Sequence, residues 1–454
     1  MANLISDMAR AVGLPRLKRA AGVVTRRLPI PQPLLMVGPG SSTRLAQAVA
    51  DFGHKKVFVV TDAVIVKLGL LQPLLDTLSA AGAAFELFDT ITPDAPIPVI
   101  EAGIERYEAA GCDALLAFGG GSVMDAAKVI GLAAANRKHP RELVGYFKGL
   151  RAPPPIYAVP TTAGTGSEVT VAAVISDPET HQKLVVADTR LVPRMAALDP
   201  VLMTGLPAPI TAATGMDALT HAVEAYIGEW GTPYTDRMAL AAVAMVYRHL
   251  TRACADGSDL EAREQMALAS TYAGLAFTRA NVGNVHAIAH QLGGRYGTPH
   301  GLANAIVLPA VLHWCSAAVP RKLATLARRA GLGEAGEDET ELARRFVASV
   351  EDMNRAIGIP SQLAALRVED IPALAEAACA EADANYPVPQ VMSTTACESL
   401  LLGLLFDKPK PKYKSKSAGA PRRKATPAVV PVKARKKAAV AAKPTRARKP
   451  PARA

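Results

Sequence analysis

Three of the nine histidines lie within one short segment, "HAIAHQLGGRYGTPH", which runs from His286 to His300. His286 and His290 are four residues apart, so they share one face if the segment is helical. His300 follows Gly-Gly and Thr-Pro, where we expect the helix to have ended. Imidazoles that converge from a helix face and from the loop beyond it are typical of a metal site. Such a site needs further ligands elsewhere in the chain.

A carboxylate and another imidazole occur upstream, in "GMDALTHAVEAY". Asp217 and His221 are four apart in a strongly helical stretch, so both point to one face. Such a pair alone is usually a surface ion pair or a helix-stabilising contact. With His286 and His300 it offers one oxygen and three nitrogen ligands, which suit Fe²⁺ or Zn²⁺ better than Ca²⁺ or Mg²⁺. The chain contains no H-E-x-x-H motif, which argues against a metalloprotease site.

A glycine-rich loop, "FGGGSVMDAAK" from Phe118 to Lys128, follows an apolar segment and opens a helical one. Glycines let the backbone approach a pyrophosphate, and the free N–H groups of a helix N-terminus attract its charge. The loop is not the common G-x-G-x-x-G fingerprint, and a glycine turn before a helix is often only a tight connection. A second loop, "VPTTAGTGSE" from Val159 to Glu168, also leaves a strand and is rich in hydroxyl groups. We expect both loops at the carboxyl edge of a parallel sheet, where ligands bind.

Asp62 ends the apolar stretch "VFVVTD". A carboxylate at a strand end can accept hydrogen bonds from a ribose 2′-hydroxyl, and it repels a 2′-phosphate. The alternative is that Asp62 only caps the helix that follows. Read with the glycine loop, Asp62 favours NAD over NADP.

Strand and helix patterns alternate between residues 34 and 200, which predicts a parallel sheet covered by helices on both faces. From about residue 209 the strand signals fade and helical periodicity continues. We predict an α/β dinucleotide-binding domain (33–207) and an all-α metal and substrate domain (208–406). A basic extension (1–32) precedes them and a Lys/Ala/Pro-rich tail (407–454) follows. The expected strands are 55–62, 83–89, 113–121 and 155–162, and the expected helices are 73–82, 98–111, 122–136, 210–227, 234–254, 260–277 and 321–331.

The excess positive charge is confined to the tail. Of the 51 basic residues, 17 lie between Lys408 and Ala454, where there is no acid, so residues 1–407 carry 34 basic and 40 acidic side chains, a net charge of −6. A segment this poor in large apolar residues is expected to be disordered. Its charge suits non-specific binding of nucleic acid or another polyanion, and equally suits a solubilising extension. Residues 1–27 are also basic; a helix on the surface of the body is favoured over a transit peptide.

The five cysteines are scattered without a C-x-x-C pair, which disfavours a zinc ribbon or a disulfide framework and fits a reducing cytoplasm. Gly, Pro or charged residues interrupt the apolar stretches, so we predict no transmembrane helix. We expect a cytoplasmic homo-oligomer without membrane contact.

In its motifs the chain resembles the iron-containing (group III metal-dependent) alcohol dehydrogenases. The resemblance covers about residues 33–402 and is carried, in the family's order, by "GGGSVMDAAK", "PTTAGTGSEVT", "TGMDALTHAVEAY", "GNVHAIAHQLGGRYGTPHGLANAIVLP" and "NYPVP". It implies a dinucleotide-binding domain followed by a helical domain, with the active site in the cleft between them. It implies the metal ligands Asp217, His221, His286 and His300, and a histidine near the nicotinamide at His290. It implies the cofactor-binding residues Asp62, Gly119, Gly120, Gly121, Ser122, Thr161, Thr162 and Lys183.

Two features depart from the family. Asp94 stands where members often have asparagine, so a cofactor contact there is in question. The family pattern normally ends soon after "NYPVP", so the basic tail is an addition.

The resemblance and the residues together predict an NAD-dependent dehydrogenase that moves a hydride between a small primary alcohol, or its aldehyde, and the cofactor, with Fe²⁺ (or Zn²⁺) as the metal. A divalent ion lowers the pKa of a hydroxyl bound to it. His290 lies one helical turn from His286 and could relay the hydroxyl proton, or could merely shape the pocket. A metal-free reductase and a glycerol-type zinc dehydrogenase of the same superfamily are weaker hypotheses. A different class, a polyanion-binding protein with an enzyme-like scaffold, is the alternative. Ethanol, butanol, a diol or an aldehyde all remain open as the substrate.

Overall fold

A computed structural model describes residues 22–23, 27–180 and 182–406. The expectations for the basic N-terminal segment and for the tail fall almost entirely on residues outside these ranges. Everything below concerns the body of the chain.

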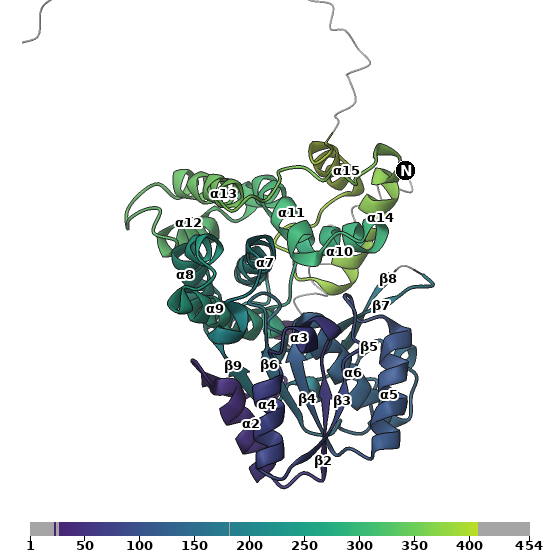
Figure 1. Cartoon of the computed structure of the whole chain (residues 1–454). Coiled ribbons are helices and arrows are strands. Elements are labelled where there is room, and N and C mark those ends of the chain that lie inside the picture. The colour runs from purple at the N-terminus through teal and green to yellow at the C-terminus, as the bar shows by residue number, and fades with distance from the viewer. Residues whose placement is uncertain (1–21, 24–26, 181, 407–454) are drawn as a thin grey trace, which may run out of the picture. The chain divides into compact units, whose positions relative to one another are not determined.

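A six-stranded, all-parallel sheet forms the centre of the N-terminal half (Figure 1). The strand order is β1-β9-β6-β4-β2-β3. Strand β4 is buried on both faces, which explains its uninterrupted apolar sequence "ALLAFG". The strands are β1 (Leu34–Val37), β2 (Lys56–Val60), β3 (Ala84–Phe88), β4 (Ala114–Gly119), β6 (Ile156–Pro160) and β9 (Met195–Leu198).

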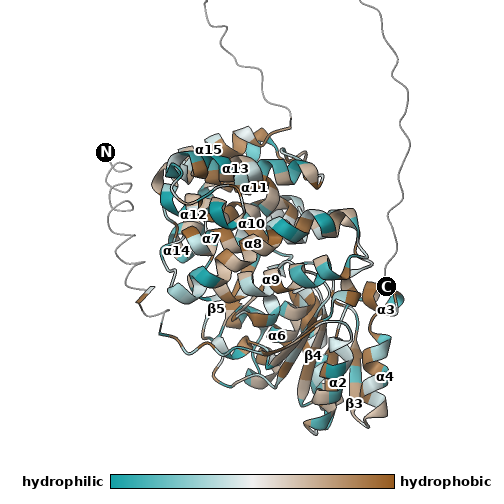
Figure 2. Ribbon diagram, turned by 90° about the vertical axis from the view of Figure 1, so that its left-hand side faces the viewer, coloured by the Kyte–Doolittle hydropathy of each residue, from teal (hydrophilic) through white to brown (hydrophobic). Residues whose placement is uncertain are grey.

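Helices cover both faces of this sheet, as the alternating sequence pattern predicts. In β2, Val57 and Val59 pack against α2 and α4, whereas Phe58 and Val60 point to the side of α5 and α6. The strands are largely brown in Figure 2, whereas the covering helices α2 and α4 show both colours, as expected for helices with one buried face. The helices are α2 (Ser41–Asp51), α3 (Ala63–Lys67), α4 (Gln72–Ala80), α5 (Ile97–Ala110) and α6 (Gly121–Asn136).

A second, three-stranded sheet was not predicted. Strands β7 and β8 form an antiparallel pair, and β5 adds to β8 in parallel. Burial alternates along β7, as is typical of a half-exposed sheet, and the short strands of this sheet give only a weak sequence signal. This sheet places Lys183 near the cofactor loops. The strands are β5 (Gly145–Tyr146), β7 (Ala172–Asp177) and β8 (Gln182–Ala187).

The C-terminal half is helical, so the predicted fold class, an α/β sheet followed by helices, is confirmed. Its core is one continuous cluster of buried aliphatic and alanine side chains to which α7 to α15 all contribute. The helices are α7 (Ala208–Ile227), α8 (Pro233–Ala255), α9 (Leu260–Ala280), α10 (Asn284–Tyr296), α11 (His300–Cys315), α12 (Pro320–Arg329), α13 (Glu339–Ala356), α14 (Ile371–Asn385) and α15 (Thr394–Gly403).

One expectation about the histidine segment is wrong. Helix α10 continues through Gly293 and Gly294 and ends only at Gly297, whose φ of 62° is the left-handed conformation that favours glycine. His300 is therefore not on a loop: it is the first residue of α11, directly after Pro299.

Within the described residues, the segment His300–Ala318 is long and apolar enough to cross a membrane, judged by length and composition only, which the sequence prediction did not foresee. Half of it is buried in the fold. It contains the whole of α11, which packs against α7, α10 and α13 and contributes many residues to the helical core. These contacts are those of a core helix.

Candidate active site

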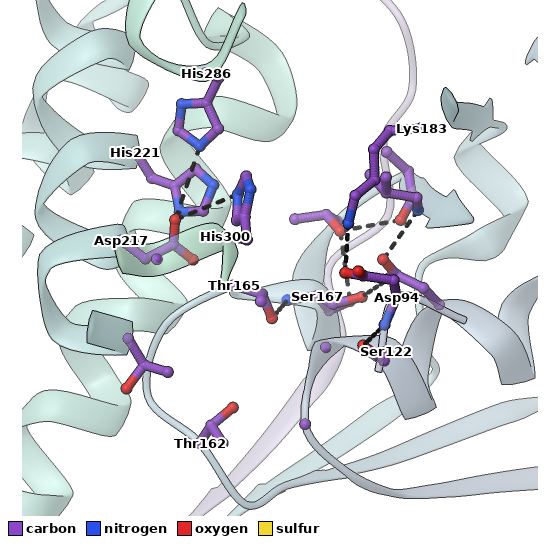
Figure 3. A pocket seen from close by; sticks show the side chains of 18 of the residues that line it. Asp94, Ser122, Thr162, Thr165, Ser167, Lys183, Asp217, His221, His286 and His300 are labelled. Atoms are coloured by element: carbon purple, nitrogen blue, oxygen red, sulfur yellow. Dashed lines mark hydrogen bonds and ion pairs between the residues drawn. The ribbon is translucent and has the colours of Figure 1, made fainter. Parts of the chain in front are cut away.

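A large cleft, with a volume of about 2320 Å³, lies at the carboxyl edge of the six-stranded sheet and is closed on its other side by the helical half. Figure 3 shows the two groups that face it: an Asp/His cluster on the helices, and Lys183, Asp94 and Ser122 on the α/β side. The loop that carries Thr162, Thr165 and Ser167 runs between the two groups. The cleft therefore joins both motifs that the sequence singled out.

The four side chains named as metal ligands lie together in space. Their ligand atoms all fall within 4.8 Å of one another. From Asp217 Oδ1, the nearest ring nitrogens are 3.5 Å away in His300, 3.9 Å in His286 and 4.0 Å in His221. Ligands at about 2.1 Å from a tetrahedral ion lie about 3.4 Å apart, so the cluster is close to the size that such an ion requires. We call this group the Asp/His cluster (Asp217, His221, His286 and His300).

The chemistry of the cluster suits a borderline divalent cation. Burial lowers the pKa of all three histidines: to about 4 for His300, well below the usual range for His286, and below the ordinary value for His221. The imidazoles are therefore neutral at pH 7 and present lone pairs rather than protons. Nδ1 of His221 is buried and has no hydrogen-bond partner among the described residues. A buried ring nitrogen that has no hydrogen-bond partner and lies beside a carboxylate fits the role of a metal ligand.

Neighbouring side chains fix two of these rings. Nδ1 of His286 lies 2.6 Å from Oε2 of Glu224, a buried carboxylate that also accepts the backbone N–H groups of Gly283 and Val285. A proton on Nδ1 leaves Nε2 of His286 as the acceptor that faces the cluster. The ring of His221 stacks on Phe277, with ring centroids 4.2 Å apart, and on His286 at 4.5 Å. Burial raises the pKa of Glu224 to about 7, while the backbone N–H groups oppose that rise.

Sequence reasoning missed Asn304, which is fully buried at the centre of the cluster. Its Nδ2 lies 2.7 Å from Asp217 Oδ1, 3.1 Å from His300 Nε2 and 3.2 Å from His286 Nε2. Its Oδ1 is buried without a partner among the described residues. Of these three contacts, the one to Asp217 can persist beside a metal, because a carboxylate oxygen has a second lone pair, whereas the two Nε2 lone pairs would turn to the metal. Its spacing of four residues from His300 was the available signal, and so was the spacing of Glu224 three residues after His221.

We expect Asn304→Leu to weaken metal binding about 10- to 100-fold, because it removes the hydrogen bond that orients the carboxylate of Asp217 as a metal ligand. Leucine has a similar volume, so the buried site stays filled while the hydrogen bonds are lost. Competition with a coloured chelator measures the affinity directly. Asn354→Leu is a matched control, because Asn354 is another buried asparagine, bonded to Ala305 O at 2.7 Å and not lining the cleft. Equal metal affinity in Asn304→Leu and the native protein would contradict this role.

His290 also lines the cleft, one turn beyond His286 on α10. Its ring stacks on that of His300, with ring centroids 5.3 Å apart. Its Nδ1 lies 2.6 Å from Oε1 of Glu381, a residue of α14 that the sequence did not single out. The structure thus places His290 beside the Asp/His cluster.

The glycine loop leads from β4 into α6, as the sequence predicts, and Gly120, Gly121 and Ser122 line the cleft. A Cβ atom at Gly121 would lie 2.5 Å from Thr165 Cγ2, so a side chain there would displace the second loop. Gly121 therefore lets the two loops pack closely at the N-terminus of α6, and a helix N-terminus is where phosphates bind. Gly119 does not line the cleft: it ends β4 and packs against Val123.

The second loop, after β6, lines the same cleft through Thr161 and Thr162. A buried lysine ties it to α6. Nζ of Lys128 donates to Ser167 Oγ at 2.8 Å and to Thr170 O at 3.1 Å. Burial lowers the pKa of Lys128 to about 8. Lys128 thus links α6, the helix that begins at the glycine loop, to the second loop.

Asp62 follows β2 and lines the cleft. Its Oδ1 caps α3 by accepting the N–H groups of Val64 at 2.9 Å and Ile65 at 3.0 Å. The capping alternative is therefore realised in the structure. It does not exclude the ribose contact, because both hydrogen bonds use the same oxygen. In the sheet, β2 lies between β3 and β4. The chain continues from β2 to β3 on one side and from β4 to β6 on the other, so the strand order reverses between β2 and β4. Dinucleotides bind at such a point.

Lys183 lines the cleft from β8, and its Nζ forms an ion pair with Asp94 Oδ1. Asp94 N–H donates to Ser122 Oγ at 3.0 Å. Asp94 has a φ of 68°, a conformation that asparagine and aspartate tolerate better than most residues. Aspartate at this position suits the left-handed backbone as asparagine would, and its carboxylate pairs with Lys183.

The fold and the cleft together define a class of enzyme in which an α/β half binds a dinucleotide and a helical half binds a metal. Comparisons with known proteins agree with this class. The family "Iron-containing alcohol dehydrogenase" matches residues 33–200, and "Fe-containing alcohol dehydrogenase family, C-terminal" matches residues 211–403. The chain is 41% identical to a 1,3-propanediol dehydrogenase of Klebsiella pneumoniae over 351 residues, which are 76% of this chain and 91% of the relative. It is 38% identical to an NAD-dependent methanol dehydrogenase of Bacillus methanolicus over 346 residues, again 76% and 91%.

A solved structure of a 1,3-propanediol oxidoreductase superposes with a TM-score of 0.79 at 38% identity, covering 82% of this chain and 97% of that one. The chain therefore belongs to the iron-containing alcohol dehydrogenase family, whose members use NAD and iron. The resemblance inferred from the motifs is confirmed, as are the enzyme class and its cofactors.

Proposed function

We propose that the protein interconverts a small primary alcohol and its aldehyde with NAD as the hydride carrier, in the cleft described above. The observation that carries the proposal is that one cleft is lined both by the Asp/His cluster and by the glycine loop. The names of the relatives, which include 1,3-propanediol, methanol and lactaldehyde as substrates, support a short alcohol or diol.

In this proposal the helical side of the cleft binds the metal and the α/β side binds NAD. On the helical side, the Asp/His cluster would hold Fe²⁺, with Zn²⁺ as the alternative. On the α/β side, Asp62 would receive the ribose of NAD. The remaining cofactor residues would hold the pyrophosphate and the nicotinamide half: Gly119 (by shaping the loop), Gly120, Gly121, Ser122, Thr161, Thr162 and Lys183.

When bound, the metal polarises the alcohol or carbonyl oxygen as a Lewis acid and NAD accepts or donates the hydride. Asp217 supplies the negative charge that a divalent cation needs, and the neutral imidazoles supply lone pairs. Phe277, Val282 and Trp230 give the lining apolar surface, which favours exclusion of water from the reacting atoms. His290 is the residue we assign to proton transfer, because it lies beside the cluster and faces the cleft.

The proposal is tested by following the formation of NADH in protein loaded with Fe²⁺ or Zn²⁺, over methanol, ethanol, butanol and 1,3-propanediol, and the reverse reaction over the aldehydes. We expect turnover with at least one short alcohol or diol. No turnover with any of them in either metal form would contradict the proposal.

The finer expectations from the sequence belong to this proposal as well. We place the domain limits at 1–32, 33–207, 208–406 and 407–454, and we expect a cytoplasmic homo-oligomer. Polyanion binding by the tail is an additional expectation with no support from the relatives. Comparing DNA retention by the full chain and by a chain truncated after Leu405 tests it, and equal retention would dismiss it.

A further inference from the structure

Glu381 lies at the edge of the cleft on α14, outside all of the sequence motifs, and its carboxylate contacts three side chains. Its Oε1 lies 2.6 Å from His290 Nδ1 and accepts the Tyr386 hydroxyl, also at 2.6 Å. Its Oε2 accepts the Gln291 amide at 2.7 Å. The Gln291 amide and the Tyr386 hydroxyl therefore donate to this carboxylate, and the His290 ring nitrogen lies within hydrogen-bond distance of it.

This arrangement fixes where the proton of His290 resides. Glu381 already accepts hydrogen bonds from the Tyr386 hydroxyl and the Gln291 amide, so the His290 nitrogen at 2.6 Å is placed as a further donor to this carboxylate. In a neutral ring, a proton on Nδ1 leaves Nε2 as a free lone pair. Only a tenth of the His290 side chain is exposed, so the packing of α10 on α14 holds the ring in this orientation.

We propose that Glu381 is the positioning residue that sets the tautomer of His290, so that Nε2 is ready to take the hydroxyl proton of the substrate. The inference rests on the proposed function. In alcohol oxidation the O–H bond breaks and an N–H bond forms at Nε2, while the carbon gives its hydride to NAD⁺. Glu381 then lies beside an imidazolium ion and stabilises its charge, as the third group of a catalytic triad does for its histidine.

A purely structural role for Glu381, as a link between α10 and α14, predicts a different outcome. Loss of such a link would lower stability without moving the proton of His290 or changing kcat selectively. The substitution Glu381→Gln distinguishes the positioning role from the purely structural role, because glutamine keeps the size and the hydrogen-bonding capacity of the side chain but adds a donor.

The first readout is the tautomer itself, from ¹⁵N-histidine NMR of the zinc-loaded protein, with the His290 signals assigned by their loss in His290→Ala. We expect Nδ1–H in the native protein and in Glu381→Asp, and loss of this form in Glu381→Gln. The native tautomer in Glu381→Gln would overturn the proposal. This readout requires no turnover, so it decides the inference even if the proposed function fails in the alcohol screen.

The second readout is kinetic. We expect Glu381→Gln to lower kcat about 10- to 100-fold, which is within the range for impaired general acid–base catalysis. Metal content and KM for NAD⁺ are expected to stay unchanged, and Glu381→Asp is expected to restore most of kcat. Glu351→Gln is a matched control, because Glu351 pairs with His313 at 2.8 Å outside the cleft. A loss of kcat that follows only a loss of metal or of folded protein would also overturn the proposal.

Discussion

Replacing His286 with alanine is expected to remove most of the bound metal and to lower kcat by about 10³-fold or more. His286 is buried, its Nε2 faces Asp217, and Glu224 holds its other nitrogen. Alanine leaves three ligands and a gap through which water can reach the ion. A divalent cation contributes several kcal/mol to stabilising the developing charge, and about 4 kcal/mol corresponds to a factor of about 10³ in rate. Metal analysis of protein purified without oxygen, followed by the NADH assay, measures both effects.

The matched control is His313→Ala, which removes a histidine from the same helical half but outside the cleft. It is expected to keep its metal and its turnover. Circular dichroism checks that both variants are folded. Full turnover by metal-free His286→Ala would contradict the assignment of the cluster.

Replacing Asp62 with glycine is expected to shift the cofactor preference towards NADP, raising the ratio of kcat/KM for NADP over NAD at least tenfold. A carboxylate within about 4 Å of a phosphate costs about 1–4 kcal/mol per charge pair at effective dielectric constants between water and the protein surface. Every 1.4 kcal/mol is about tenfold in binding. Asp62 lies at the end of β2 where such a phosphate would be placed.

Asp62 also caps α3, so the effect of Asp62→Gly on cofactor preference must be distinguished from an effect on stability. Glycine is a tolerable cap, and its cost relative to aspartate is about a few tenths of a kcal/mol. Asp338→Gly is the control: Asp338 caps α13 by accepting the Glu341 N–H at 2.9 Å, and it does not line the cleft. A native preference for NADP, or an unchanged ratio in Asp62→Gly, would show that the ribose is bound elsewhere.

Much of the fold follows from periodicity. The buried strands of the parallel sheet are short apolar runs between turn signals, and the helices after residue 208 have long amphipathic patterns, so both are predictable from local sequence. The β7–β8 pair was missed because each strand is a run of only six residues, and a short apolar run alone does not distinguish a strand from part of a helix. The position of His300 was missed because Pro299 can equally precede a helix as its cap or follow one.

The candidate site was partly predictable because its ligands are reactive side chains at helical spacing. The residues that position them were harder to find. Asn304 and Glu224 lie four and three residues from His300 and His221, but asparagine and glutamate are too common for spacing to identify them. Glu381 comes from a helix about 90 residues further along the chain, and only tertiary packing brings it to His290.

The most direct test of the account is a titration of metal-depleted native protein with Fe²⁺ in the absence of oxygen, with turnover of NAD⁺ and a short alcohol measured at each step. The account predicts no turnover without metal and a linear rise that stops at one ion per chain, because the Asp/His cluster is a single four-ligand site. Substantial turnover in the metal-free protein, or a rise that continues beyond one ion per chain, would contradict it.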